Sequence, residues 1–176
     1  IDSGMAFIGS VKKYKGLDQI LIEENIEFLK KESFFVYGKF VGGQYRLKKI
    51  IKDYHLRSID SFFDESVFDV VIRARTILVL PYYDISQSGF MYTLAGRGIP
   101  FIASNVGDVS DFLHSIDMKQ ALFDPKKKED IHRAYNFVRE NFDIFKGKLE
   151  IAKPKFDWII PTTTILSLAD KFDDNI

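Results

Sequence analysis

The segment "LPYYDISQSGFMYTLAGRGIPFIASNVGD", residues 80–108, decides the fold of this chain. It opens at the end of an apolar run, passes through the polar turn "DISQSG", and continues through a helical stretch into a second apolar run. Strand, turn, helix and strand in this order predict a βαβ unit with two parallel strands. The Ser- and Gly-rich turn is then either a simple connection or a binding site for an anion at the start of the helix.

The same alternation extends along most of the chain. The expected strands are residues 5–9, 33–39, 56–62, 76–81, 100–104 and 120–124. The expected helices are residues 17–31, 44–55, 64–75, 88–98, 108–115 and 125–142, with Asp18, Asp64 and Ser88 as N-caps and Pro125 near the start of the last helix. The strands are continuous apolar runs, which is typical of strands buried on both faces. The sequence therefore predicts a single α/β domain over residues 1–176, with a Rossmann-like, doubly wound parallel sheet of about six strands.

The composition excludes several classes of protein. Of the 176 residues, 46% are hydrophobic, so the chain can form a core. The 25 basic and 25 acidic residues cancel, which argues against a protein that grips nucleic acid non-specifically. There is no cysteine for a disulfide framework or a thiolate metal site, and three scattered histidines lack metal-ligand spacing. No apolar run approaches the roughly 20 residues that span a bilayer, and the first residues do not resemble a signal peptide.

Three lysines occupy the loop after the first expected strand, "GSVKKYKGLD", residues 9–18. Lys12, Lys13 and Lys15 stand just before a helix, where backbone N–H groups and the helix dipole add to their charge. This arrangement suits a phosphate, and a solvated basic loop is the alternative interpretation. The loop contains neither a P-loop nor a G-x-G-x-x-G motif, so it carries no NAD fingerprint.

The turn in the opening segment carries a second set of anion-friendly features. Ser88 can cap the following helix, and Gly89 lets a ligand approach backbone N–H groups. No acidic residue stands in the first turn of this helix. Because the carboxyl ends of parallel strands meet at one edge of the sheet, a diphosphate would lie between this helix start and Lys12 and Lys15.

Two stretches resemble the C-terminal domain of glycosyltransferases of the GT-B fold, family 4 or close to it. "FIGSVKKYKGLDQILIE", residues 7–23, resembles the opening of that domain. "VLPYYDISQSGFMYTLAGRGIPFIASNVGD", residues 79–108, resembles its donor-site segment. With "FFVYGK" and "ALFDP" at the places of further strands, the resemblance covers about residues 7–142 in order.

The resemblance implies a binding site for a sugar nucleotide. The lysines of the first loop and the helix start would contact the donor diphosphate, and the nucleoside would lie between the Gly38 region and the loop near Phe62. The residues expected to bind the donor are Gly9, Ser10, Lys12, Lys15, Gly38, Phe62, Ser88, Gly89, Phe90 and Thr93.

The sequence departs from the family pattern at the same helix. The family commonly has two glutamates in an E-x7-E pattern, and the matching positions here are Ile85 and Thr93. Asp84 is the nearest acid to the first position and is the candidate catalytic residue. Asp108 stands where the family usually has a glycine.

A GT-B enzyme has two Rossmann-like domains, and the resemblance implies that this chain is the donor half without the acceptor half. The whole enzyme would transfer a sugar from UDP or GDP to a glycan or lipid-linked acceptor, in surface polysaccharide synthesis, with retention of configuration. Residues from about 143 to 176 would form helices that close the domain. The chain alone would be inactive, no metal or nucleic acid is expected, and the enzyme would be cytoplasmic, with peripheral membrane contact only through the missing half.

The sequence is also compatible with two other functions. One is a non-catalytic α/β nucleotide-binding module, because both glutamates are missing. The other is a flavodoxin-like or receiver-like domain that acts through protein contacts. A receiver needs an acidic cluster at its strand ends, and a flavodoxin needs a Ser/Thr-rich first loop, whereas this loop is rich in lysine.

Overall fold

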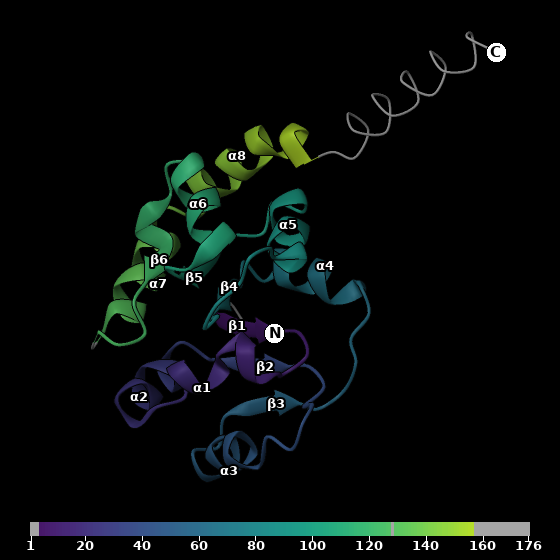
Figure 1. Ribbon diagram of the computed structural model, residues 1–176, viewed down its shortest axis with the longest axis vertical. Helices are drawn as coiled ribbons and strands as arrows, with labels where there is room; N and C mark the ends of the chain where they lie inside the picture. Colours follow the sequence, from purple (N-terminus) through teal and green to yellow (C-terminus); the bar gives the residue numbers. More distant parts are fainter. Residues whose placement is uncertain (1–3, 128, 157–176) are drawn as a thin grey trace, which may run out of the picture.

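Six parallel strands form one sheet in the computed structural model, which describes residues 4–127 and 129–156. The strands are β1 (Met5–Ile8), β2 (Phe35–Tyr37), β3 (Arg57–Ile59), β4 (Ile77–Leu80), β5 (Phe101–Ser104) and β6 (Leu122–Phe123). Their order across the sheet is β3-β2-β1-β4-β5-β6, which Figure 1 shows from one end of the molecule to the other. This is the Rossmann order, in which the direction of winding reverses between β1 and β4. The predicted fold class is confirmed.

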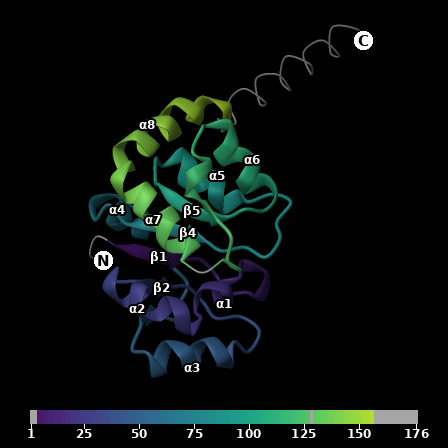
Figure 2. The same cartoon turned by 90° about the vertical axis from the view of Figure 1, so that its left-hand side faces the viewer.

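Helices cover both faces of this sheet. They are α1 (Leu17–Ile20), α2 (Glu23–Lys31), α3 (Tyr45–Asp53), α4 (Ser66–Arg73), α5 (Gly89–Gly96), α6 (Gly107–Ser115), α7 (Asp130–Glu140) and α8 (Phe142–Ala152). Helices α1, α2 and α7 lie on one side, and α4 and α5 lie on the other (Figures 1 and 2). The carboxyl ends of the strands therefore open between two helical layers, at the edge where ligands bind in doubly wound sheets.

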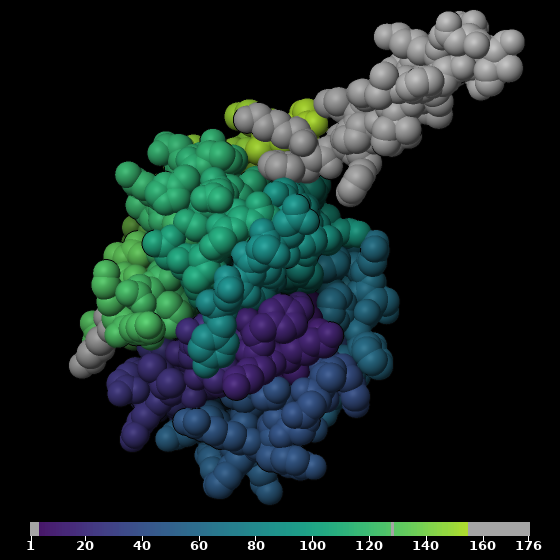
Figure 3. Space-filling model, viewed as in Figure 1, coloured from purple at the N-terminus to yellow at the C-terminus, as the bar shows by residue number. Residues whose placement is uncertain are grey.

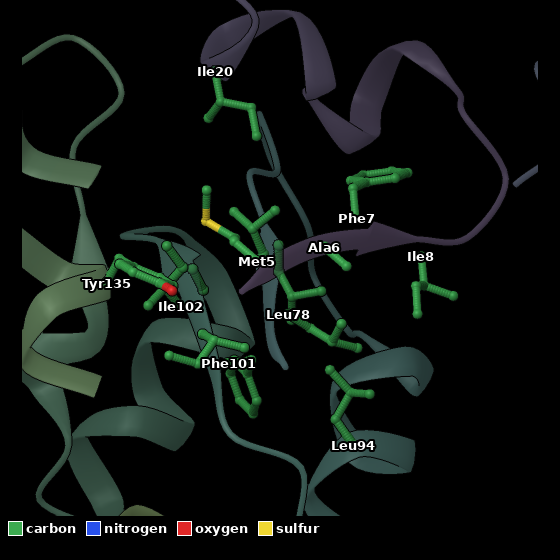
Figure 4. Packing of buried hydrophobic residues seen from close by; sticks show 14 of the residues in the cluster. Met5, Ala6, Phe7, Ile8, Ile20, Leu78, Leu94, Phe101, Ile102 and Tyr135 are labelled. Carbon is green, nitrogen blue, oxygen red and sulfur yellow. The ribbon is translucent and has the colours of Figure 1, made fainter. Parts of the chain in front are cut away.

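The core explains why the strands are continuous apolar runs. Every residue of β1, β4 and β5 is buried. In Figure 4, Phe7 lies on the side of β1 that faces Ile20 of α1, whereas Ile8 lies on the side of Leu94 of α5. Successive side chains of a strand point to opposite faces, so a strand covered on both faces needs apolar residues at every position.

The helix predicted over residues 17–31 is two helices. Chain direction changes at Leu21 and Ile22, and Ile22 is extended at the start of α2. The buried Asn25 bridges the break by donating its side-chain N–H to Ile20 O at 3.2 Å. Asp18 is not the N-cap that the sequence predicted, because Gly16 in the left-handed region (φ 65°) is the N-cap of α1, two residues earlier.

The later helices also start or end away from their predicted bounds. Helix α7 begins at Asp130 rather than near Pro125, because residues 125–127 form a turn and bend instead of helix. Asp64 lies one residue before the N-cap of α4, yet its carboxylate accepts from Ser66 N at 2.8 Å. The predicted closing helices are α8 and a 3-10 turn at Lys153–Phe156, and the helix expected after residue 160 lies outside the described residues.

Candidate functional site

Glycine at the end of β1 makes room for a lysine. Gly9 has φ 135°, and a Cβ built there would come within 2.9 Å of Lys15 Nζ. The loop turns back through a 3-10 turn, which places the Lys15 ammonium 5.3 Å from the centre of the Phe90 ring on α5. Two predicted donor-binding residues, Lys15 and Phe90, are thus brought together across the ends of β1 and β4. Ser10 is half-buried in the same loop.

The Lys15 ammonium lies in this position without an acidic partner. Burial, and then the charge of Lys12, lower the pKa of Lys15. Among residues 4–127 and 129–156, no carboxylate forms an ion pair with it. Lys12 and Lys13 are exposed. A half-buried cation without a counter-charge favours an incoming anion, because the anion would replace the hydration that burial has removed.

Helix α5 presents its N-terminus to the same place. Ser88 caps it as predicted, since its Oγ accepts from Met91 N at 3.1 Å. The N–H groups of Gly89 and Phe90 have no acceptor in the described part of the chain, as expected for the first turn of a helix. A Cβ at Gly89 would meet nothing within 4 Å, so there is open space beside the first residue of α5.

The first loop, which follows β1, is held against the loop after β4 by hydrogen bonds and close packing. Gly16, with φ 65°, approaches the end of β4 so closely that a Cβ there would lie 1.8 Å from Pro81 O. Gln19 donates its side-chain N–H to the same carbonyl at 2.6 Å. Tyr83 N donates to Tyr14 O at 3.0 Å. In the space-filling view, the purple N-terminal segment and the teal segment after β4 lie in contact (Figure 3).

Two tyrosines of the loop after β4 complete this contact. Tyr83 OH donates to Asp18 Oδ2 at 2.6 Å, and this hydrogen bond raises the pKa of Tyr83 to about 12. Tyr82 is buried with its hydroxyl 3.3 Å from Ser88 Oγ, and burial raises the pKa of Tyr82 to about 12. Both phenols are therefore neutral at ordinary pH and act as hydrogen-bonding groups rather than as bases.

Asp108 is the unexpected residue at this site. Its carboxylate accepts from Ser88 N at 3.4 Å and from Tyr92 OH at 2.9 Å. The site therefore contains an acid beside the start of α5, where the sequence resemblance expects a glycine. Sequence reasoning noted the departure but missed the contact. The sequence did contain a signal for this contact. Asp108 follows β5, which lies next to β4, so the loops after these two strands meet at the same edge of the sheet.

The other predicted residues have different surroundings. Thr93 donates its hydroxyl to Gly89 O at 3.0 Å, so this side chain is bound to its own helix. Asp84 is exposed, and its carboxylate has no hydrogen bond or ion pair within the described ranges. Gly38 lies against Gly9, since a Cβ at Gly38 would come within 1.8 Å of Gly9 O.

A row of aromatic rings runs from the end of β2 to the start of α5. Tyr37 meets Phe63 with ring centres 5.9 Å apart, Phe63 meets Phe68 at 6.1 Å, and Phe68 meets Phe90 at 6.0 Å. Phe62, next to this row, is 80% exposed. The structure thus places the predicted nucleoside-binding residue Phe62 on the surface beside a packed aromatic wall that sequence reasoning missed.

A second missed cluster fixes the loop after β2. Asp60 accepts from Phe40 N at 3.1 Å and from Lys48 Nζ at 2.7 Å, and Lys39 Nζ lies 3.4 Å away. The Lys48 hydrogen bond, followed by the Phe40 N–H, lowers the pKa of Asp60 to about 2. This carboxylate stays ionised above that pH, and it ties the loops after β2 and β3 together.

No family model matches the sequence, and no curated protein matches it. Solved structures do match the fold. HepE from Anabaena, in complex with UDP-glucose, superposes with a TM-score of 0.74 at 14% identity over 96% of this chain and 49% of that chain. The chain has the fold of one half of a GT-B glycosyltransferase. This confirms the fold that the resemblance implied.

Two isolated domains match the GT-B half as well. The C-terminal domain of the glycosyl transferase group 1 protein LpcC from Francisella tularensis gives a TM-score of 0.65 at 17% identity, over 88% of this chain and 86% of that chain. The catalytic domain of cholesterol-alpha-glucosyltransferase from Helicobacter pylori gives 0.66 at 12% identity, over 89% and 98%. The present chain thus spans most of the length of these two domains, but only about half of the HepE chain.

The described residues were also searched for a metal centre and for a membrane span. They contain no group of three or more His, Cys, Asp or Glu side chains that could hold a metal ion. None of the helices in these ranges is both long and apolar enough to cross a bilayer.

Proposed function

We propose that this chain binds a nucleoside diphosphate sugar at the carboxyl ends of β1 and β4, as the donor half of a glycosyltransferase. The observation that carries the proposal is the Lys15 ammonium. It is half-buried, lacks an acidic partner in the described residues, and lies 5.3 Å from the ring of Phe90 at the start of α5. A diphosphate between Lys15 and the N–H groups of Gly89 and Phe90 would satisfy all three. The HepE complex with UDP-glucose supports the same ligand class.

The same groups would assist transfer. The bond between the sugar's anomeric carbon and the diphosphate oxygen breaks, and its electron pair stays on the diphosphate. The acceptor hydroxyl forms the new bond to the anomeric carbon, and its proton passes to the departing diphosphate oxygen. Lys15 and the α5 N-terminus stabilise the negative charge that develops on the leaving diphosphate. The acceptor, which we propose is a glycan or a lipid-linked glycan, would be held by the other half of the enzyme.

Further parts of the proposal rest on the family resemblance. They are the use of UDP or GDP, the role in polysaccharide synthesis, a hexosyl group as the sugar transferred, and a cytoplasmic enzyme that contacts membrane only through its other half. Asp84, which is exposed in the loop before α5, is the proposed catalytic residue. No role for a metal is part of the proposal.

A non-catalytic nucleotide-binding module is the second candidate. It is favoured by Ile85 and Thr93 at the two glutamate positions, and by the hydrogen bond that occupies the Thr93 hydroxyl. The carboxylate of Asp108 beside Ser88 N also opposes an anion at the α5 start. Both candidates predict nucleotide binding, and only the enzyme predicts turnover when an acceptor-binding half is supplied.

Nucleotide binding is tested by thermal unfolding of the chain with UDP, GDP and ADP, each at millimolar concentration. We expect at least one to raise the melting temperature, because a ligand at 100 times its dissociation constant adds about 2.7 kcal/mol to the free energy of unfolding. Inorganic phosphate at the same concentration is the control for a general ionic effect. If no nucleotide shifts the transition, the chain is not a donor domain.

Replacing Lys15 should weaken this binding more than replacing Lys13. A charge-assisted contact to phosphate contributes about 1.5–3 kcal/mol, so Lys15→Ala should raise the dissociation constant about tenfold or more. Lys13 is exposed in the same loop, which makes Lys13→Ala the matched control for loss of charge. The measurement is a calorimetric titration with the nucleotide that stabilises the chain.

The unliganded stability of the same two variants provides a second readout. Burial disfavours the Lys15 ammonium in the empty fold, whereas its contact with the Phe90 ring favours it, so Lys15→Ala should change the melting temperature of the unliganded chain little. Equal losses of affinity in both variants would instead mean that the loop acts only as a diffuse positive field.

A further inference from the structure

A second cavity opens beside the site described above. It measures about 760 Å³ and lies at the carboxyl ends of β4, β5 and β6. Tyr82 and Tyr83 form the wall on the side of the first loop, and Ser104 and Asn105 lie at the end of β5. Neither Lys15 nor the start of α5 lines it. Its volume falls within the range of about 300–1,000 Å³ that is usual for small-molecule sites.

The cavity has an excess of positive charge. Lys119, Lys126 and Lys127 line it, and none of them forms an ion pair with a described residue. Its two acids, Asp124 and Asp130, are engaged in other interactions, which involve backbone N–H groups and an arginine. Lys127 interacts with Asp130 only at longer range than an ion pair, and Lys119 likewise with Asp117. Because the basic residues of the lining outnumber its two carboxylates, the cavity favours an anion.

The hydrogen bonds of the two acids and the arginine are well defined. Asp130 accepts from Arg133 Nε at 2.6 Å and from Asp124 N at 2.8 Å. Asp124 accepts from Lys126 N at 2.9 Å. Arg133 is directed inward as well, donating to the carbonyls of Gln120 at 2.8 Å and Leu122 at 2.5 Å. These bonds hold the wall of the cavity, and the net charge of its lining residues stays positive.

Ser104 supplies an independent sign of a ligand. It lines the cavity although it is only 1% exposed, so it lies at the bottom. Its Oγ has no hydrogen-bond partner within the described ranges. A buried hydroxyl without a partner opposes folding, so such groups are rare and call for an explanation. A ligand oxygen at the bottom of the cavity would satisfy it.

We propose that this cavity binds an anionic sugar, which carries a phosphate or a carboxylate. The lysines at the rim would hold the oxyanion, and the Ser104 hydroxyl would bond a polar oxygen of the ligand. The cavity is much larger than a phosphate ion, and Tyr83, which is 46% exposed, is an aromatic residue of its lining against which a sugar would pack. The site shares the Tyr82–Tyr83 wall with the first loop, so a sugar bound here lies next to the donor cleft.

The first test is a calorimetric titration of the 176-residue chain with glucose 6-phosphate. Glucuronate, glucose and inorganic phosphate are the comparison ligands. We expect glucose 6-phosphate or glucuronate to bind at millimolar concentration or better, and to bind at least about tenfold more tightly than glucose, as a charge-assisted contact predicts. Phosphate alone should bind more weakly than glucose 6-phosphate. Equal binding of glucose, equal binding of phosphate, or no binding of either anionic sugar would overturn the proposal.

Variants locate the binding. The double variant Lys126→Ala and Lys127→Ala should weaken the anionic sugar about tenfold or more, because it removes two charge-assisted contacts. Lys31→Ala removes an exposed lysine at the C-terminal end of α2 and is the matched control, expected to leave the affinity unchanged. Equal affinity in the double variant and the control would overturn the proposal.

Ser104→Ala separates a ligand contact from a structural role. Since the hydroxyl is buried without a partner, its removal should leave the melting temperature equal or higher while the affinity for the anionic sugar falls several-fold. A lower melting temperature with unchanged affinity would mean that Ser104 serves only the fold, and would overturn its part in the site.

The outcome is independent of the proposed donor site. UDP should neither compete with the anionic sugar nor lose affinity in the double variant, because Lys15 and α5 do not line the cavity. If Lys15→Ala abolishes binding of the anionic sugar, the sugar occupies the donor cleft and the cavity proposal is wrong. If no nucleotide binds but the anionic sugar does, the donor function fails and this inference stands.

Discussion

Supplied with a sugar nucleotide and a panel of acceptor sugars, the 176-residue chain is expected to release nucleotide no faster than slow hydrolysis of the donor. Its candidate groups, Lys12, Lys15 and Asp84, all follow β1 or β4 and so lie at one edge of the sheet. Holding an acceptor hydroxyl in line with the anomeric carbon can lower the activation free energy by about 7–11 kcal/mol. Lys12, Lys15 and Asp84 do not supply that positioning. Water in an open site also weakens each electrostatic contact there.

The measurement is the rate of nucleotide release with and without an acceptor-binding domain added to the reaction. Lys15→Ala is the control, because it should slow any residual hydrolysis that depends on the donor site by about tenfold or more. Transfer to an acceptor by the chain alone, at rates of ordinary enzymes, would show that the chain needs no second half.

The substitution Gly16→Ala is expected to reduce the free energy of unfolding by about 2–5 kcal/mol. For a residue with a Cβ, the left-handed conformation destabilises the folded state by about 1–2 kcal/mol. Forcing a methyl group into a filled space destabilises it by about a further 1–3 kcal/mol. Gly16 has φ 65°, and its Cβ would lie 1.8 Å from Pro81 O. For a chain of this length the melting temperature should fall by about 5–15 °C. Urea unfolding measures the free energy directly.

Gly147→Ala is the matched control for a glycine substitution. Gly147 lies within α8, and a Cβ there would meet nothing within 4 Å. Alanine favours a helix interior by about 0.5–1 kcal/mol over glycine, so this variant should be slightly more stable than the native chain. If Gly16→Ala were as stable as Gly147→Ala, the close contact between the first loop and β4 would not exist in solution.

The sequence predicted the sheet well because burial on both faces leaves a local signal. A strand such as β1 or β4 is apolar at every position, and glycine or polar turns mark its ends. The break between α1 and α2 left no such signal. Ile20, Leu21 and Ile26 are all buried on either side of it, so the apolar pattern continues through a change of direction.

The candidate site was predictable where it depends on neighbours in sequence. The Ser88 cap follows from a serine just before a helix. The basic loop is evident from three lysines within four residues. The Asp108 contact joins residues 20 positions apart, and it depends on how two loops meet beyond β4 and β5. The cavity at Ser104 likewise needs three strands in place, so neither feature has a signature in any short segment. The roles predicted for Gly38 and Phe62 in nucleoside binding stay predictions.

The contacts between the first loop and the loop after β4 have a consequence for how related sequences vary. Pro81 O receives Gln19, Tyr14 O receives Tyr83 N, and no space remains at Gly16. An extra residue in either loop would shift one set of partners past the other. We therefore expect insertions and deletions to be absent from both loops in homologues that keep this contact, and a length change in one to be accompanied by a compensating change in the other.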